Sequence, residues 1–405
     1  MNESSQHPQS PWSLAWSRFR RNRLAMLGLI VIALAAIIAV LGAHIRPDST
    51  RHANSQQLAL ASKPPGFELS MLALRNNAPL PESDFFGALF FGGKPQKMKH
   101  IPLHDFVIQG DSIRGYSFGG EAGVPGLPFA YHLADVCYAL ASVPKAADAG
   151  FDKLKVERIG EAAIEISAEE LAQKVREEHI LQQRFILGTD KFGRDMLSRL
   201  MAGTIVSLSV GLISVLISLV LGMSLGALAG YFGAWVDDLI TWLINVVWSI
   251  PTLLLVIAIT FALGKGFVQV FVAVGLTMWV EVARVVRGQV LGLRNLEFVE
   301  AGRALGYRPG RIIFRHIMPN VLGPVIVVSA ANFASAILLE AGLSFLGIGA
   351  QIPMASWGQM IKEHYAYITT SMAYLALLPG FCIMLLVLAF MLVGNGLRDS
   401  LDSRL

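Results

Sequence analysis

Residues 300–306, Glu-Ala-Gly-Arg-Ala-Leu-Gly, and residues 311–320, Arg-Ile-Ile-Phe-Arg-His-Ile-Met-Pro-Asn, lie between two long apolar runs. A connector that only joined two apolar helices would need just a few polar residues. Here residues 296–305 instead place apolar and charged side chains at helical spacing, and Gly306 can end that helix in a left-handed turn. Pro309 can open a second helix, because its missing N–H costs nothing in a first turn. The segment predicts an amphipathic helix, a glycine stop and a second helix that enters the next apolar run.

The first of these two helices predicts a docking surface. Glu300 and Arg303 are spaced to form an ion pair on one side. Phe298, Ala301 and Leu305 share another side and would expose apolar surface to water. Insertion into a groove of a partner protein would cover such a surface. No residue of the segment is positioned for catalysis.

The composition indicates a membrane protein. Of the 405 residues, 54% are hydrophobic and 15% are charged, whereas a soluble protein has about a quarter charged residues. The apolar residues form runs of about the 20 residues that a bilayer-spanning helix needs. The expected spans are residues 24–43 and about 203–230, 238–263, 267–290, 318–342 and 373–396.

Arginines set the expected topology through the positive-inside rule. One cluster precedes the first span, and seven arginines lie in residues 281–316. An even number of spans separates the two clusters, so both termini and the loop at 294–316 are expected in the cytoplasm. Residues 1–23, with Trp12, Trp16 and Phe19 among their arginines, predict an amphipathic segment on the inner leaflet.

The polar stretch 44–185 between the first two spans is expected outside the cytoplasm as a small α+β insertion. Residues 105–118 predict a hairpin that turns at Gly110-Asp111, and residues 145–166 predict further strands. Ser167 is placed to cap a helix that follows. The five residues expected to form its core are Phe106, Ile108, Ile113, Leu171 and Val175.

The segment quoted first resembles the coupling loop of bacterial ABC-importer permeases. Its Glu-Ala-Gly, the following Gly306, and the Ile-x-x-x-His-Ile-x-Pro-Asn ending at 312–320 match the peptide and nickel branch most closely. Three further elements resemble that branch: residues 187–195, residues 340–349 with Ser-Trp-Gly at 356–358, and the tail at 394–402. The chain departs from the family pattern at Asn395, where an Asp is usual, and by having a single proline in 351–355.

The resemblance implies an all-α polytopic permease of the type I ABC importer fold, with residues 186–405 as its core. It implies a second, homologous permease subunit in a heterodimer, two ABC ATPases that bind ATP and Mg, and an extracytoplasmic solute-binding protein. It implies peptide transport by alternating access across a bacterial inner membrane, with no cofactor and no catalysis in this chain. The residues implied to couple the chain to the ATPases are Glu300, Ala301, Gly302, Ala304, Gly306, Arg311, His316, Pro319 and Asn320.

Four residues of the apolar runs are candidates for translocation or gating: Pro251, Asn332, Ser335 and Glu340. Pro251 would bend a span, as a gate or as a static kink. Glu340 is an ionisable residue within an apolar region, which favours function, although an outer-interface position is equally open. Gly222, Gly226 and Gly230 repeat at four-residue spacing, which predicts close helix packing.

Residues 187–195 admit two readings. Thr189 or Asp190 can cap the following helix and the acids can pair with Arg194, or the paired acids can form a site; capping is favoured. His100 and His104 have metal-like spacing without a matching pair, so no metal site is expected. The basic residues flank spans, so no nucleic-acid binding is expected.

Other functions stay open from the sequence. An ABC-type sensor or mechanical transmitter suits the oversized insertion, and nickel or another small solute can replace peptides. A membrane enzyme would need convergent polar groups, which only Glu281 and Glu340 approach. No Gly-x-x-x-x-Gly-Lys-Ser/Thr motif is present, so nucleotide binding by a P-loop is not expected.

Overall fold

The computed structural model describes residues 11–77, 87, 93–141, 153–159, 162–264 and 266–401. The chain divides into two compact units. The helical unit comprises residues 1–39, 203–369 and 376–405, and the insertion unit comprises residues 40–202 and 370–375.

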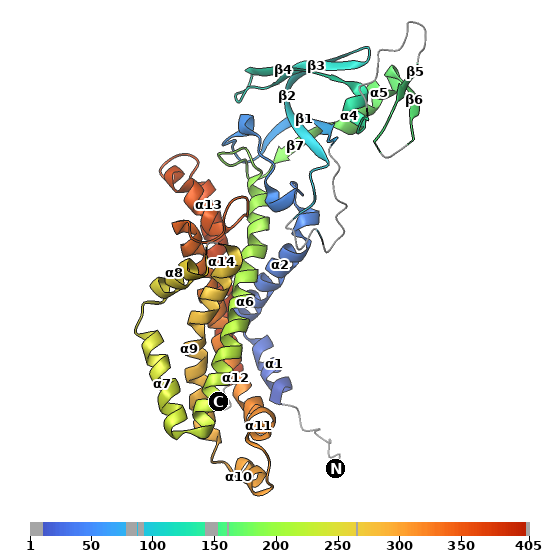
Figure 1. Ribbon diagram of the computed structural model, residues 1–405. Coiled ribbons are helices and arrows are strands. Elements are labelled where there is room, and N and C mark those ends of the chain that lie inside the picture. Colours follow the sequence, from blue (N-terminus) through green and yellow to red (C-terminus); the bar gives the residue numbers. More distant parts are fainter. Residues whose placement is uncertain are drawn as a thin grey trace, which may run out of the picture. The chain divides into compact units, whose positions relative to one another are not determined.

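The described residues contain five helices that are long and apolar enough to cross a membrane, or six spans if one bent pair counts as a span. The spans are α2 (Arg23–Ile45), α6 (Met196–Phe232), α9 (Phe267–Leu293), a helical run from Pro309 to Leu346, and α14 (Tyr374–Leu401), with α7 (Ala234–Trp248) and α8 (Thr252–Leu263) as the bent pair (Figure 1). Shorter helices include α1 (Pro11–Arg21), α10 (Glu297–Ala304) and α13 (Trp357–His364). The expected polytopic helical fold is confirmed for the described residues.

The third expected span is broken rather than kinked. The sequence predicted one helix over 238–263, whereas α7 and α8 meet at a bend of 94°. Pro251 stands at the break in an extended conformation, with φ −54° and ψ 122°. A proline cannot donate to the preceding turn, and it disfavours helical backbone in the residue before it. The single-helix prediction is therefore wrong at 249–251.

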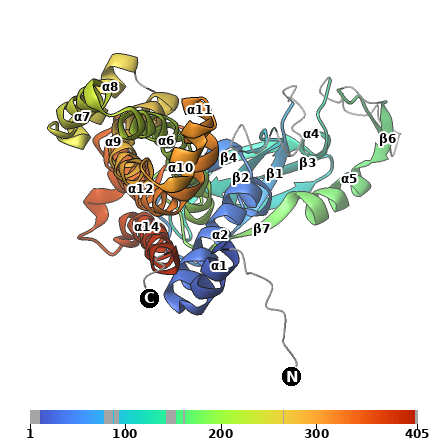
Figure 2. The same cartoon turned by 90° about the horizontal axis from the view of Figure 1, so that it is seen from below.

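Glycines let α6 and α9 pack backbone to backbone. A Cβ added at Gly226 would lie 2.5 Å from the carbonyl oxygen of Ala283, and Gly222 and Gly230 face Val282 and Val290 in the same way. The α9 helix also packs along α12 (Met318–Leu346), and these helices lie side by side in both views (Figures 1 and 2). The predicted small-residue packing is confirmed.

The α1 helix differs from the expected interfacial segment in one residue. Phe19 is only 2% exposed, stacks on Trp16, and approaches Gly396 of α14. Trp16 is 49% exposed. Phe19 thus packs within the protein, because Gly396 and Ala25 leave room for its ring, and only part of the aromatic face is open.

The insertion unit contains a five-stranded antiparallel sheet in the order β4-β3-β2-β1-β7. Its strands are β1 (Phe67–Arg75), β2 (Met98–Gln109), β3 (Ser112–Phe118), β4 (Pro125–His132) and β7 (Ile180–Phe185); β5 (Lys153–Val156) pairs with β6 (Ile164–Ser167). The hairpin between β2 and β3 turns at Gly110, whose φ is +58°. Both predicted hairpin strands are confirmed, and residues 145–152 of the other strand prediction lie outside the described residues.

The insertion unit has its own apolar core. Ile113, Leu171 and Val175 are fully buried in it, and Phe106 and Ile108 pack against it. The helix α5 (Ala168–Lys174) begins with a complete capping box, in which Ser167 and Glu170 exchange hydrogen bonds of 3.1 and 2.9 Å. The predicted core residues and helix cap are confirmed.

The helix α6 is not capped by Thr189 or Asp190, as the sequence predicted. Thr189 donates to the carbonyl oxygen of Leu60, and Asp190 binds Arg194 in a buried ion pair of 2.6 Å. Asp195 instead caps α6, because its Oδ2 accepts the backbone N–H of Ser198 at 2.8 Å. Helix caps lie directly before the first turn, and α6 begins at Met196, directly after Asp195.

Candidate functional site

The α10 helix ends in a complete Schellman motif. The N–H of Tyr307 donates to the carbonyl of Gly302 at 3.0 Å, and the N–H of Gly306 donates to that of Arg303 at 2.9 Å. Gly306 has φ +74°, the left-handed conformation that this motif requires. Pro309 then opens the turn α11 (Pro309–Arg311), which continues through the π-helical turn η4 (Ile312–Ile317) into α12. The expected helix, glycine stop and second helix are therefore all present.

One face of α10 is held by the spans. Val299 is fully buried and Gly302 is buried beside Tyr307 and Ile312. Val299 shares an apolar cluster with Ile312 and Ile317 of η4, and with Val286 and Val290 of α9. The α10 helix therefore sits on the base of α9 and α12 and does not rely on its own eight residues for stability.

The adjoining face of α10 is apolar and exposed. Phe298 is 40% exposed, Leu305 is 69% exposed, and Ala301 lies open between them. Phe314 of η4 is 74% exposed. We call Phe298, Ala301, Leu305 and Phe314 the coupling surface.

Cation–π contacts replace the expected ion pair. Glu300 and Arg303 make no ion pair in the described part of the chain, and the Arg303 guanidinium lies 5.3 Å from the Tyr231 ring centroid. Tyr307 lies between the Arg311 guanidinium, at 4.1 Å, and the His316 ring, at 5.9 Å. The pairing prediction is wrong because an aromatic ring from the end of α6 lies within reach of Arg303.

The implied coupling residues fall into two groups. Those exposed on the segment are Glu300, Ala301, Ala304, Gly306, Arg311, Pro319 and Asn320. Gly302 is buried and His316 is half-buried, so these two support the segment from within. Sequence reasoning missed Phe314 and Tyr307, although an aromatic residue within an otherwise charged and aliphatic turn was a signal for both.

The break between α7 and α8 borders two cavities of the helical unit. A cavity of about 320 Å³ is lined by Trp248, Ile250 and Thr252 at the break, with Glu281 of α9 and Ser335 of α12. Glu281 also lines a cavity of about 490 Å³ together with Arg284, Asn395 and Arg398. The Arg284 guanidinium lies 3.6 Å from the Trp248 ring centroid. The structure thus brings Ser335 to the break at Pro251.

Glu340 and Asn332 are buried away from these cavities. Glu340 Oε1 accepts hydrogen bonds from the hydroxyls of Ser344 at 2.7 Å and Ser356 at 2.6 Å. The side-chain amide of Asn332 has no hydrogen-bond partner among the described residues. Glu340 is therefore not at an open interface, and it lines neither of these two cavities. The two acids do not converge as a membrane enzyme would require.

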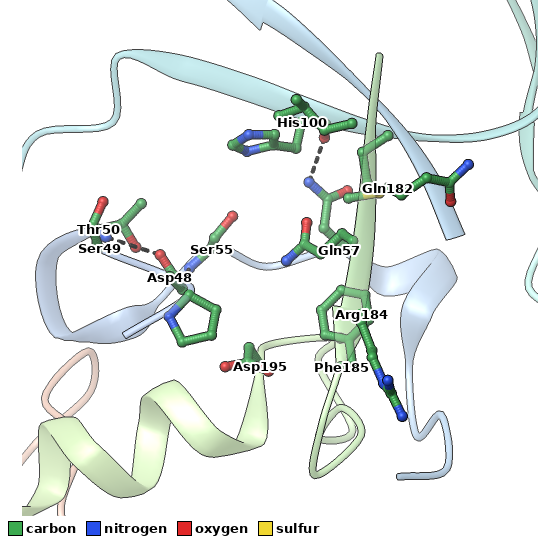
Figure 3. A pocket seen from close by; sticks show the side chains of 15 residues that line it. Asp48, Ser49, Thr50, Ser55, Gln57, His100, Gln182, Arg184, Phe185 and Asp195 are labelled. Carbon is green, nitrogen blue, oxygen red and sulfur yellow. Dashed lines mark hydrogen bonds between the residues drawn. The ribbon is translucent and has the colours of Figure 1, made fainter. Parts of the chain in front are cut away.

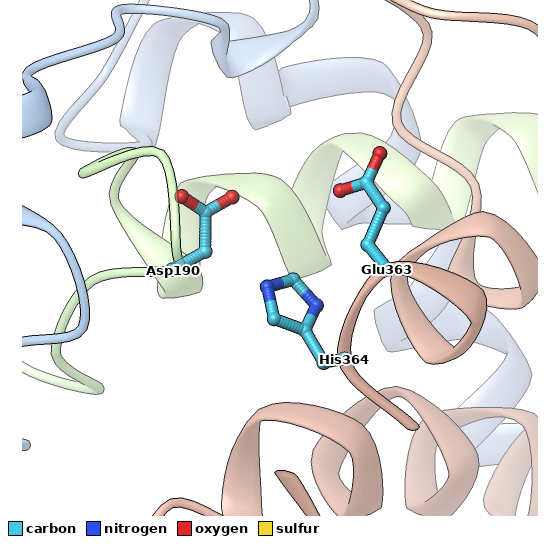
Figure 4. Close-up of side chains that lie close together, drawn as sticks. All are labelled: Asp190, Glu363 and His364. Atoms are coloured by element: carbon cyan, nitrogen blue, oxygen red, sulfur yellow. The ribbon is translucent and has the colours of Figure 1, made fainter. Parts of the chain in front are cut away.

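Other buried polar groups hold local structure. His364 ends α13 directly after Glu363 (Figure 4), and its Nδ1 lies 2.8 Å from the carbonyl oxygen of Met360. Asp190, on the segment before α6, accepts the backbone N–H groups of Phe192 and Arg194 at 2.9 Å each. These bonds assign both residues a structural part.

Comparisons with known proteins place the chain in a family. Residues 222–405 match the family model of the binding-protein-dependent transport system inner membrane component, and residues 10–65 match the N-terminal transmembrane domain of oligopeptide transport permease C. Residues 66–221 lie outside both matches.

Curated relatives agree with these matches. A dipeptide transport system permease protein of Alkalihalophilus pseudofirmus is 44% identical over 218 residues, which cover 54% of this chain and 71% of the relative. A glutathione transport system permease protein of Pectobacterium atrosepticum is 41% identical, with 54% and 72% coverage. An oligopeptide transport system permease protein of Bacillus subtilis is 37% identical, with 54% and 71% coverage.

The chain is therefore a multi-pass membrane permease. It belongs to the family of inner membrane components of binding-protein-dependent transport systems, in the branch of the dipeptide and oligopeptide permeases. Membership implies ATPase and binding-protein partners.

Proposed function

We propose that this chain forms half of the translocation pathway of an ATP-driven importer for dipeptides or oligopeptides. The three relatives described above are named for dipeptide, glutathione and oligopeptide transport, and glutathione is itself a short peptide. The importer would lie in a bacterial inner membrane, with both termini and α10 in the cytoplasm, as the arginine distribution favours.

The observation that carries this proposal is the coupling surface. It exposes Phe298, Leu305 and Phe314 on a helix whose other face is fixed by Val299 to the spans. An apolar helix face of this kind fits a groove on a partner protein. We assign the groove to a cytoplasmic ATPase.

The way that α10 is built supports a mechanical role. Pressure on α10 reaches η4 through the contact of Val299 with Ile312, and η4 runs without interruption into α12. Closure of the ATPases on ATP and Mg would move α10 and hence α12. The spans would then change the side to which the pathway opens, which is alternating access.

The break between α7 and α8 is the proposed gate. Trp248 and Ile250 line the same cavity as Ser335, so movement of α12 would change the space beside Pro251. Glu340 and Asn332 are buried in α12 and would act through the packing of that helix.

The proposed assembly contains this chain, a second homologous permease, two ATPases that hold ATP and Mg, and a solute-binding protein outside. The insertion unit is proposed to dock the binding protein. A sensor or mechanical transmitter is the competing function, because the insertion falls outside both family models and has its own core. Nickel is the competing solute.

Uptake by the reconstituted complex tests the function. Proteoliposomes that hold the full complex should accumulate labelled alanyl-alanine with ATP, and they should not accumulate Ni²⁺. A sensor would hydrolyse ATP without accumulating either solute. Nickel uptake alone would reverse the solute assignment.

The substitution Gly306→Val tests the coupling. No atom lies within 4 Å of a Cβ at this position, so the cost is the left-handed backbone alone, about 1–2 kcal/mol. We expect roughly tenfold slower ATP-driven uptake with normal insertion of the protein, since 1.4 kcal/mol is a factor of ten. Gly310→Val is the matched control, because Gly310 also faces open space and lies in helix α11. Equal uptake by the two variants would refute the role of this turn.

A further inference from the structure

The insertion unit contains a cavity of about 370 Å³ (Figure 3). Its walls come from residues 47–57, from β7, and from the segment that ends at Asp195, with His100 of β2 above them. Hydroxyl and amide side chains predominate among its polar residues, which include Ser49, Thr50, Ser55, Gln57, Gln182 and Gln183. A volume of this size accommodates a small organic molecule.

Asp195 is a lining residue of this cavity, and its carboxylate is only partly hydrogen-bonded. Its side chain is only 4% exposed, and one carboxylate oxygen, Oδ2, caps α6 through Ser198. The other oxygen, Oδ1, has no hydrogen-bond partner among the described residues. Leaving a buried acceptor without a partner is costly, and more so for a charged group. Burial raises the pKa of the Asp195 carboxyl, and repulsion from Asp48 and Asp190 adds to this rise.

Neighbouring groups do not satisfy that oxygen. The carboxylate of Asp48 accepts the backbone N–H groups of Thr50 at 2.9 Å and Ser55 at 3.1 Å. The buried arginines of this region, Arg46 and Arg199, donate to backbone carbonyls, Arg46 to Asp48 and Thr50 at 2.6 Å each and Arg199 to His52 at 3.3 Å. Two carboxylates thus border one cavity.

The cavity suits an organic cation better than a bare metal ion. Among the described residues, the ligand atoms of Asp48, His100 and Asp195 do not gather closely enough to hold one metal ion. An ammonium group supplies three donors on a compact charge, and the body attached to it can span the rest of the space. Burial also lowers the pKa of His100, which keeps its ring neutral at pH 7.

We infer that this cavity binds the primary ammonium of a small molecule of amino-acid to dipeptide size, with the carboxylate of Asp195 as the ionic partner. The surrounding amides and hydroxyls would bind the polar groups of its body. Arg184 also lines the cavity, and its guanidinium pairs with Glu68 at 3.2 Å. The inference does not rest on the proposed transport function, because the site is formed within the insertion unit alone.

Equilibrium binding to the full chain in lipid nanodiscs tests the inference at pH 7. The probes are alanyl-alanine and N-acetyl-alanyl-alanine, in which acetylation turns the ammonium into a neutral amide. A hydrogen bond to a charged group is strong enough that we expect the acetylated probe to bind about ten- to a hundredfold more weakly. Equal affinities, or no binding of alanyl-alanine at millimolar concentration, would overturn the inference.

Two variants locate the site. Asp195→Asn keeps an acceptor for the Ser198 N–H and removes the charge, so alanyl-alanine should bind about ten- to a hundredfold more weakly. Glu165→Gln makes the same change at an exposed position of β6, outside the cavity, and should bind normally. Unchanged binding in Asp195→Asn would place the amine elsewhere. If that variant fails to fold, the comparison of the two probes on the natural chain still decides the matter.

Discussion

The coupling segment 296–320 and the insertion at 44–185 are both polar stretches that separate apolar helices, yet they are stabilised in opposite ways. The coupling segment packs Val299 into a cluster that the spans provide, and it leaves Phe298 and Phe314 exposed. The insertion buries Ile113, Leu171 and their neighbours in a core of its own. A short helix cannot bury enough surface to fold alone, whereas a stretch of domain length can. The short segment is therefore mechanically joined to its spans.

The same contrast appears in the comparisons with relatives. The coupling segment lies inside the longer family match at 222–405, and the insertion lies largely in the unmatched residues 66–221. An insertion with its own core can be added between spans at little cost to the helices.

Membrane sidedness gives an all-or-none test of this comparison. A cysteine introduced at Asp111 should react with a membrane-impermeant maleimide in intact cells whose outer membrane is made permeable. A cysteine at Arg308 should react only after lysis, because the arginines near it favour the cytoplasm. Mass spectrometry of the labelled protein measures both.

The native cysteine of the insertion makes a clean background for this labelling. Cys137 is buried, and burial raises the pKa of its thiol to about 12, so it carries almost no thiolate at pH 7. Labelling of both new cysteines in intact cells, or the reverse pattern, would show that the two regions do not lie on opposite sides.

Local patterns predicted the coupling segment well. Gly306 and Pro309 act through backbone geometry, which depends on residue type and position alone, and both occupy the expected places. The expected Glu300–Arg303 pair failed because Tyr231, distant in sequence, offers Arg303 an aromatic face. Contacts between distant segments leave no periodic signal in a single sequence.

In the insertion, too, local features were predictable and contacts between distant segments were not. Its hairpin and the Ser167 cap are local, and both were predictable. The strand order β4-β3-β2-β1-β7 and the cavity beside Asp195 depend on segments more than a hundred residues apart. The 94° break at Pro251 exceeded the expected kink because nothing in the sequence shows that α8 packs on α9.

The substitution Gly226→Val should damage the helical region and spare the insertion. The new Cβ would lie 2.5 Å from the carbonyl oxygen of Ala283. Overpacking a core usually costs about 1–3 kcal/mol, and a clash this close with backbone should cost more. Hydrogen exchange should accelerate in α9 and in α10, which share an apolar cluster. The β2–β3 hairpin should keep its protection.

Gly288→Val is the matched control for this change. Gly288 lies on the same helix pair, and a Cβ there meets no atom within 4 Å. Its exchange rates should stay close to those of the natural chain. Equal damage from both variants would mean that close α6–α9 packing is not what holds α10.

The substitution Leu171→Ala should damage the insertion and spare the helical region. Leu171 is fully buried in the insertion core, so truncation should cost about 2–5 kcal/mol there. Hydrogen exchange should accelerate in β2, β3 and α5 while α10 stays protected. Leu127→Ala, at a side chain that is 79% exposed, should change neither region. Loss of protection in α10 with Leu171→Ala would show that the insertion and the coupling segment are not independent.

The smallest expected difference between the two regions is in how their stability depends on pH, and it comes from His52. Burial, together with repulsion from Arg51, Arg46 and Arg199, lowers the pKa of this imidazole to about 4. The unfolded chain takes up that proton near the ordinary 6.5, so between about pH 6.5 and 4 it binds more protons than the folded chain. The insertion unit should therefore lose stability as the pH falls through this window.

The substitution His52→Asn should remove part of that loss, because Asn tolerates the φ of +56° at this position. The substitution His104→Asn, at an exposed position, should not remove it. The thermal midpoint of proteolysis within the insertion, measured at pH 7 and pH 5, reports the effect, and identical pH dependence in all three proteins would exclude His52 as its source.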